Sequence, residues 1–156
     1  MIYISHRGNI SGPNPEKENH PDYLLDAIKK GFHVEADVWF EDGNFILGHD
    51  EPQYQISAKF LSNNKFWCHA KNIAAISELR NKGSLINCFF HDTDACTLTS
   101  QGWIWTYPGQ MIISSRAIAV MPERVEGWDW ALAGGICSDI VNRYKLYFQV
   151  KNKFHL

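Results

Sequence analysis

Short apolar runs alternate with polar segments along the chain, and most of these runs have the length of β-strands. Two segments, 23–30 and 72–80, instead have apolar residues one helical turn apart, and a glycine follows each within a few residues, so both are predicted helices. Residues 128–133 are also helix-like. We predict strands at residues 2–6, 33–39, 66–70, 85–90, 103–107, 117–121 and 135–138, and a hairpin that turns at Asp42-Gly43 into an arm at 45–48.

The order of these elements predicts an α/β fold built on parallel strands. Helices 23–30 and 72–80 each lie between two strands, and strand, helix, strand is the repeating unit of parallel sheets and barrels. The connections across 91–102 and 110–116 are too short for a packing helix, and a full barrel takes about 250 residues. We therefore expect one domain, residues 1–156: a reduced or distorted TIM-type (β/α) barrel with about seven parallel strands and some outer helices missing.

A barrel that lacks outer helices leaves apolar strand surface uncovered, and such surface invites a partner subunit. The segment 144–150 alternates apolar and polar residues, and it is apolar enough to cover such a gap or to form an interface. Association into a homo-oligomer is therefore a hypothesis that a measured mass in solution can test.

Composition narrows the classes of partner. The chain has 156 residues, of which 45% are hydrophobic, so it can bury a real core. Its net charge of -2 gives no electrostatic reason to expect nucleic acid or an anionic membrane as partner. No apolar run approaches the roughly 20 residues of a transmembrane segment, and no signal-peptide pattern follows Met1. We expect a cytoplasmic protein without a transmembrane segment.

The four cysteines have no Cys-x-x-Cys spacing, and three of them lie in or beside apolar runs. Buried free thiols are common in such runs, so structural thiols are the preferred interpretation and a zinc site is the alternative. The cysteines are Cys68, Cys88, Cys96 and Cys137.

The predicted strand 33–39 carries two carboxylates on one face. Glu35 and Asp37 are two residues apart, and side chains with this spacing point to the same side of a strand. Two carboxylates near a third ligand suit a hard cation such as Mg²⁺ or Ca²⁺. This strand is therefore a candidate metal site.

Two histidines and an arginine are predicted at the same end of the sheet. The first strand ends in His6 and Arg7, and the hairpin after strand 33–39 returns His49 toward that end. A pair of imidazoles can serve as general base and general acid on the two sides of a phosphate, and a guanidinium suits phosphoryl oxygens. The sequence leaves open which histidine is the base and which the acid.

Several short motifs resemble, in order and spacing, the N-terminal signature of glycerophosphodiester phosphodiesterases. They are His6-Arg7-Gly8, Glu18-Asn19, Val34-Glu35-Ala36-Asp37-Val38, Asp42-Gly43 and His49-Asp50, and Gly135-Ile136-Cys137-Ser138-Asp139 resembles the final strand of that family. The family belongs to the phospholipase-C-like phosphodiesterases, so the resemblance implies their (β/α)8 barrel. It also implies that His6 and His49 are the general acid and base and that Arg7 binds phosphate. Glu35 and Asp37 are then metal ligands.

The third strand departs from the pattern of the family. The family has Glu-x-Lys there, with the Glu on the metal and the Lys on phosphate, whereas this chain has His69-Ala70-Lys71. Lys71 is expected either to bind phosphate or to form a structural salt bridge. The third metal ligand is then His69, or a carboxylate from a later strand end, Asp92 or Glu123. A histidine ligand shifts metal preference toward Mn²⁺ or Zn²⁺.

Together these patterns predict a metal-dependent phosphoric diester hydrolase that acts on a glycerophosphodiester-like small substrate by His/His general acid-base catalysis. The expected cofactor is a divalent ion, Mg²⁺ or Ca²⁺, with Mn²⁺ as a further candidate. The alternative is a catalytically degenerate module of the same fold that binds phosphate or metal without turnover. Replacement of the third-strand carboxylate favours this alternative, and the intact histidine pair favours the enzyme.

Overall fold

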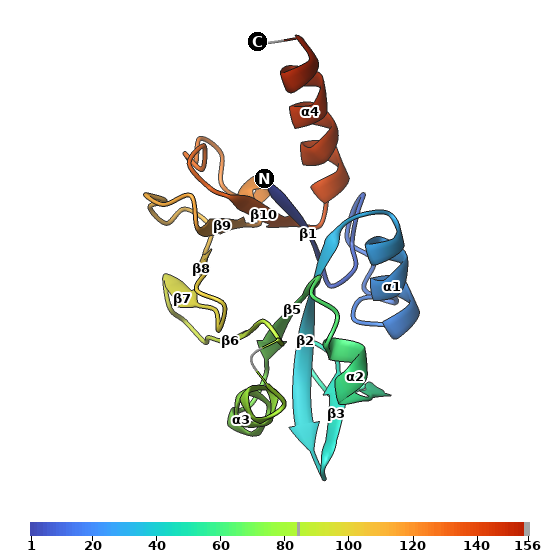
Figure 1. Cartoon of the computed structure of the whole chain (residues 1–156). Helices are drawn as coiled ribbons and strands as arrows, with labels where there is room; N and C mark the ends of the chain where they lie inside the picture. The colour runs from blue at the N-terminus through green and yellow to red at the C-terminus, as the bar shows by residue number, and fades with distance from the viewer. Residues whose placement is uncertain (84, 155–156) are drawn as a thin grey trace.

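The structure is a computed structural model that describes residues 1–83 and 85–154, which form one curled β-sheet with helices against parts of it (Figure 1). The strands are β1 (Ile2–His6), β2 (His33–Glu41), β3 (Asn44–Leu47), β4 (Tyr54–Ile56), β5 (Phe66–Ala70), β6 (Cys88–Phe90), β7 (Cys96–Leu98), β8 (Ile104–Thr106), β9 (Ala117–Val120) and β10 (Gly135–Ser138). The helices are α1 (Pro21–Lys29), α2 (Ala58–Leu61), α3 (Ile73–Asn81) and α4 (Val141–Phe154), with a 3₁₀ turn η1 (Pro122–Arg124). Each predicted strand and both predicted helices at 23–30 and 72–80 overlap an observed element.

The predicted strands pair side by side in parallel, in the order β6-β5-β2-β1-β10-β9-β8. Within the described residues, three further pairs are antiparallel: β3 with β2, β4 with β3, and β7 with β8. β2 is long enough to pair with β1 through its first residues and with β3 through its last. The hairpin between β2 and β3 turns at Asp42 and Gly43, which both have positive φ, as tight hairpin turns of this kind require.

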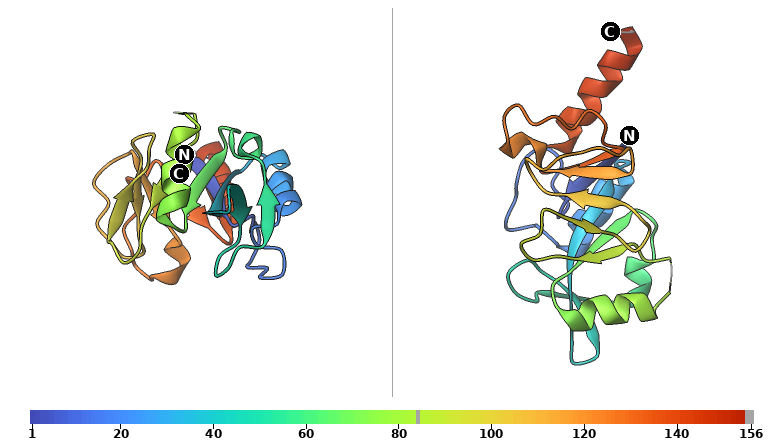
Figure 2. Two further views of the ribbon diagram at one scale, coloured as in Figure 1. Left: turned by 90° about the horizontal axis from the view of Figure 1, so that it is seen from below. Right: turned by 90° about the vertical axis from the view of Figure 1, so that its left-hand side faces the viewer.

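The predicted TIM-type barrel of parallel strands is wrong, because the sheet is mixed and open. Within the described residues β6 pairs only with β5, and β7 only with β8, so no strand ladder joins the two ends of the curled sheet (Figure 2). A barrel requires a continuous ladder around its axis. Residues 99–103 are too few for a crossover helix, so the chain reverses there into the antiparallel β7–β8 pair.

Alternate side chains of the strands divide between the two sides of the curl. Inward-pointing apolar residues of separate strands meet in one cluster: Ile4, Trp67, Phe89, Trp105, Ile118, Val120, Met121 and Cys137. This cluster lies on the inner side of the curl, just before the carboxyl ends of the parallel strands. The polar residues that follow it two positions later in β1 and β5, His6 and His69, stay on the same inner side because strand side chains alternate with period two.

The outer side is covered differently in its two halves. Helices α1 and α3 pack on β2, and α3 also packs on β5 and β6, burying Leu24, Ala27, Ala75 and Leu79 against the strands. The outer side of β8 and β9 is covered by loop residues instead, namely Ile112, Trp128, Trp130 and Ala133. The prediction of missing outer helices therefore fits the β8–β9 half of the sheet.

One local prediction near the C-terminus is wrong. Residues 128–133 are loop and turn, and no helix begins there. The segment 144–150 lies in α4, which projects away from the sheet (Figure 1). Tyr144 and Phe148, four residues apart on this helix, both pack against Trp130, with ring centroids 5.6 and 5.9 Å away. None of the described helices is long and apolar enough to cross a membrane.

Candidate active site

A pocket of about 430 Å³ opens where the parallel strands end, and the structure brings every predicted site residue to it. His6, Arg7, Glu35, His49, His69 and Lys71 line the pocket, and Asp37 lies buried directly behind them in contact with four of these side chains and with Asn19. A larger cavity of about 730 Å³ lies between α4 and the 128–131 segment, but it contains none of this histidine-carboxylate cluster. The smaller pocket is therefore the candidate site.

Strand register places the acidic and imidazole groups opposite one another. In the β1–β2 pair, His6 lies opposite Glu35, and in the β2–β5 pair, Asp37 lies opposite His69. Residues directly opposite in neighbouring strands are close enough for their side chains to interact. The polar side chains of three adjacent strands, β1, β2 and β5, thus meet at one point.

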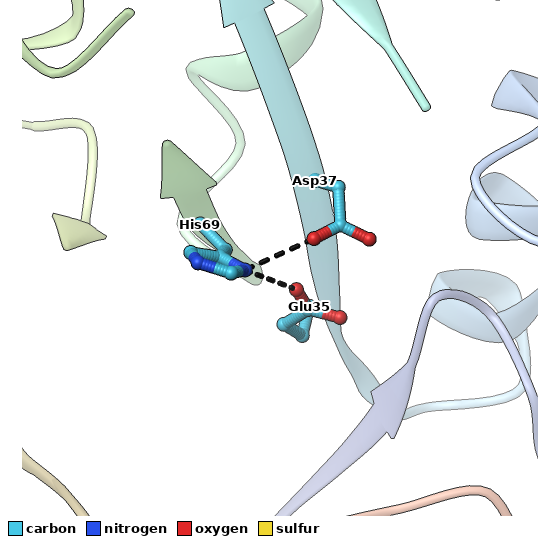
Figure 3. A group of neighbouring side chains, drawn as sticks. All are labelled: Glu35, Asp37 and His69. Carbon is cyan, nitrogen blue, oxygen red and sulfur yellow. Dashed lines mark hydrogen bonds and ion pairs between the residues drawn. The ribbon is translucent and has the colours of Figure 1, made fainter. Parts of the chain in front are cut away.

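Glu35, Asp37 and His69 form the group best suited to a metal ion (Figure 3). One ligand atom from each lies within 4.8 Å of the others, and His69 Nδ1 is 2.9 Å from Asp37 Oδ1 and 3.8 Å from Glu35 Oε1. Burial raises the pKa of Glu35, because a carboxylate loses its hydration there. The charge of Asp37 raises this pKa further, because two ionised carboxylates repel each other. A bound cation would relieve both effects, so these residues fit a divalent metal.

Asp37 is the hub of the site. Its two oxygens contact the Nδ1 atoms of His49 (3.1 Å) and His69 (2.9 Å) and the Nδ2 atom of Asn19 (2.9 Å). Arg7 Nε lies 3.0 Å away, although not aligned as a hydrogen bond, and Lys71 Nζ lies 3.6 Å away. Burial alone would raise the pKa of Asp37, but the hydrogen bonds from the two histidines and the charge of Arg7 hold it well below its usual value.

The histidine at the end of β1 is paired with a carboxylate. His6 Nδ1 lies 2.8 Å from Asp139 Oδ1, in the loop after β10, so Nε2 is the nitrogen left for proton transfer. Burial lowers the pKa of His6, but the hydrogen bond with Asp139 and the charge of Glu35 outweigh it, and the net pKa is raised. An acid-base imidazole oriented by a carboxylate is a recurring arrangement in hydrolases.

The hydrogen bonds of His49 define its tautomer. Arg7 Nη2 lies 3.1 Å from His49 Nε2, and a guanidinium only donates, so Nε2 accepts. The proton of the neutral ring is then on Nδ1, which donates to Asp37. The Nε2 atom of His49 thus faces Arg7 at the pocket, and its Nδ1 atom also lies 3.4 Å from Lys71 Nζ.

Arg7 occupies a strained turn that its neighbours hold in place. It has φ of 53°, in the left-handed region, and Gly8 follows with φ of 92°. Arg7 Nη1 donates to Glu18 at 3.1 Å, and Glu18 also accepts from Asn9 at 2.8 Å. Strained residues persist only where the surroundings stabilise them, and they cluster at functional sites. Glu18 thus orients the arginine that faces the pocket.

The two carboxylates proposed as other third metal ligands lie elsewhere. Asp92 lies at the exposed rim of the pocket, outside the metal-ligand group found among the described residues. Glu123 accepts hydrogen bonds from Ser138 Oγ at 2.7 Å and from the Asp139 amide at 3.2 Å, and it does not line the pocket. His69 is thus the third member of the group.

Sequence reasoning missed several residues that support the site. Asn19 donates to Asp37 and accepts from its amide, and Asn9 donates to both Glu18 and Asp139. Two of the supporting residues, Asn19 and Asp139, belong to the short motifs Glu18-Asn19 and Ser138-Asp139, so the sequence carried a signal for them. Asn9 carried none, because nothing local distinguishes it from an ordinary turn residue.

An aromatic wall faces the charged residues. The ring of His91 lies 4.5 Å from that of His69 and 4.2 Å from that of Tyr107. Burial, and then the nearby His69, lower the pKa of His91 to about 4, so this ring is neutral near pH 7. Trp105 is core, at 3% exposure, and Tyr107 lines the pocket, while its hydroxyl has no hydrogen-bond partner within the described part of the chain.

The cysteines take no part in the site. Cys68, Cys88 and Cys137 are buried and Cys96 is exposed, all four are free, and no metal-ligand group of the described residues contains a cysteine. The pocket combines a carboxylate-imidazole trio with three further histidines, His6, His49 and His91, and three basic side chains, Arg7, Lys71 and Arg124. A scan against models of known protein families gives no match, and neither does a search of curated proteins.

Proposed function

We propose that this chain is a metal-dependent phosphoric diester hydrolase that acts on a glycerophosphodiester-like small substrate. The observation that carries the proposal is that His6 and His49 line the same pocket as the Glu35, Asp37 and His69 trio. A binding site alone has no need of two histidines in addition to its metal ligands. The resemblance in the sequence supports the same reaction.

In this proposal the two histidines divide the proton transfers. His49, whose Nδ1 lies against Asp37 and whose Nε2 faces Arg7 at the pocket, fits the general base that takes a proton from water or from a substrate hydroxyl once Arg7 binds the phosphoryl group instead. His6, whose pKa is raised beside Asp139, fits the general acid that gives a proton to the leaving oxygen. A pair of this kind contributes roughly 10²- to 10⁴-fold per group to a rate.

The basic side chains would bind the phosphoryl group. Arg7 and Lys71 both line the pocket and are largely buried, so their charges act in a site of reduced dielectric. A bound divalent ion would neutralise the charge that develops on the phosphoryl oxygens in the transition state. Mg²⁺ and Ca²⁺ are the expected ions, and the His69 ligand favours Mn²⁺ as well.

The test is hydrolysis of bis-p-nitrophenyl phosphate by metal-stripped protein resupplied with Mg²⁺, Ca²⁺ or Mn²⁺. His6→Ala and His49→Ala should each lower the rate by roughly a hundredfold or more. His20→Asn is a matched control, because His20 caps α1 outside the pocket and asparagine also caps helices. Equal rates in all four proteins would overturn the proposal for this substrate.

A binding module without turnover is the second candidate, and one observation favours it. Asp37 has Arg7, Asn19 and two histidines as partners, so side chains of the protein can themselves stabilise its charge. Calorimetry that detects metal and inorganic phosphate binding, together with no hydrolysis of any diester, would support this candidate over the enzyme.

The hypothesis of a homo-oligomer stays a prediction. The exposed apolar residues Leu146, Tyr147 and Val150 lie on the projecting helix α4 and would be buried against a second copy of the chain. Light scattering at micromolar concentration tests this hypothesis, and a monomer mass would contradict it.

A further inference from the structure

The basic side chains of the pocket differ in how far they are already paired. Arg7 and Lys71 have only 18% and 17% of their side chains exposed, and both lie within 3.6 Å of Asp37. Arg124, which lines the same pocket from η1, is 61% exposed, and its closest carboxylate contact among the described residues is Asp139 Oδ2 at 4.0 Å. Arg124 is therefore the pocket cation with the most charge available to a ligand.

The turn that carries Arg124 is held by contacts that do not involve its guanidinium. Met121, just before η1, has φ of 48° and ψ of 52°, and its amide donates to the Cys137 carbonyl at 2.7 Å. Glu123 accepts from Ser138 Oγ and from the Asp139 amide, which ties η1 to the end of β10. A strained residue such as Met121 persists only where its surroundings over-determine it. The turn thus presents Arg124 at a set position.

Arg124 also lies beside one of the two acid-base histidines. Asp139 contacts His6 through one oxygen at 2.8 Å and lies 4.0 Å from Arg124 through the other. Arg7 and Lys71 instead contact His49, at 3.1 and 3.4 Å. The pocket therefore has two cations, Arg7 and Lys71, on the His49 side. A third cation, Arg124, lies on the His6 side and is less closely paired with carboxylates.

We propose that Arg124 selects phosphodiesters whose alcohol carries a second anionic group, a carboxylate or a phosphate, on the His6 side of the scissile bond. This inference rests on the proposed function. Arg7 and Lys71 are occupied by the scissile phosphoryl group in that reaction, so a further anion is the group left for Arg124. The planar guanidinium fork matches both carboxylate and phosphate, and both are compatible with its exposed position.

The test compares two substrates that differ by one carboxylate. The metal-loaded full chain is given glycerophosphoserine or glycerophosphoethanolamine, and kcat/KM is measured for each by mass spectrometry of the products. The ratio of the two values should fall roughly ten- to hundredfold in Arg124→Gln relative to the unaltered protein, since a charged hydrogen bond is lost for one substrate only. A glycerol diester of 2-phosphoethanol, run in parallel, shows whether phosphate is preferred to carboxylate.

Arg143→Gln is the matched control, because Arg143 is an exposed arginine on α4 outside this pocket, and its ratio should equal that of the unaltered protein. If the unaltered protein cleaves both diesters and Arg124→Gln leaves the ratio unchanged, the inference is overturned while the phosphodiesterase stands. If no protein cleaves any of the diesters with any of the three metals, the proposed function is overturned and this inference with it.

Discussion

The half of the sheet formed by β1, β2 and β5 differs from the half formed by β8, β9 and β10 in two ways: in the elements that pack on its outer side, and in the number of charged side chains on its inner side. Helices pack on the outer side of the first half, and its inner side holds Glu35, Asp37, His6 and His69. Loops cover β8 and β9, and the inner side of that half is mainly aromatic and apolar. The buried charges thus lie where packed helices fix the strands that carry them, which is what a site with exact distances needs.

The two halves contribute different things to the pocket. The helix-covered half supplies the Glu35, Asp37 and His69 trio, the basic side chains Arg7 and Lys71, and His49. The loop-covered half supplies Tyr107, the Asp139 partner of His6, and the exposed Arg124. We infer that the first half determines the chemistry, and that the second half orients one histidine and determines which substrate is accepted.

The largest effect should come from Asp37→Asn. The change keeps the side-chain volume but removes the charge at the hub of the site, so Mn²⁺ binding should be lost and diester hydrolysis should fall by roughly a thousandfold or more. Calorimetry and the hydrolysis assay measure the two losses. Asp129→Asn, in the loop-covered half, is the control and should match the unaltered protein. Full metal binding by Asp37→Asn would show that the trio is not the metal site.

A pair of Leu→Ala changes tests how much the packing of α3 on the helix-covered half contributes to stability. Leu79 of α3 is fully buried, whereas Leu132, in the loop after η1, is 62% exposed. Leu79→Ala should lower the free energy of unfolding by about 2–5 kcal/mol, and Leu132→Ala by less than about 0.5 kcal/mol. Urea unfolding measures both. Similar losses in the two variants would contradict the packing of α3 against the sheet.

Asp139→Asn should lower the pKa of His6. Asp139 raises that pKa above 6.5 through its hydrogen bond, against the effect of burial, so removing its charge lets the imidazole lose its proton at lower pH. Because the folded-state pKa is the raised one, the stability from protonated His6 is fully present below pH 6.5 and is lost as pH rises through the raised value.

The His6 ring resonances, followed by NMR across pH, measure this shift directly. The stability difference between the unaltered protein and Asp139→Asn should also shrink as pH rises. Asp129→Asn again serves as control and should leave the titration of His6 in place. An unchanged His6 titration in Asp139→Asn would show that the pairing does not govern this histidine.

The smallest effect is expected at the turn that carries Arg124. Glu123→Gln removes a charge that accepts two hydrogen bonds at an exposed position, so the free energy of unfolding should fall by only about 0.5–1.5 kcal/mol. Glu126→Gln, an exposed neighbour, is the control for loss of charge alone. A loss above about 3 kcal/mol would mean that η1 is part of the core of the fold rather than its edge.

Local patterns in the sequence were enough to locate eight of the ten strands, the helices α1 and α3, and the shared face of Glu35 and Asp37, but not the short strands β4 and β7. Periodicity predicts these features because side-chain direction in a strand or helix depends on the residue's own backbone. The same reasoning failed at 128–133, where no helix forms, and it does not account for Ile73, an apolar residue of the predicted helix 72–80 that is 78% exposed. At both places the neighbours in space, rather than the local pattern, determine the outcome.

Sequence by itself determined which residues have the chemistry for this site, because residue type and strand spacing are local properties. Tertiary structure alone decided that the sheet is mixed and open, that Asp139 holds His6, and that Arg124 faces the pocket. These features depend on contacts between residues such as His6 and Asp139, which are far apart in the chain and meet only when all the strands between them have paired. No local pattern records such a contact, since its energy is gained only in the complete fold.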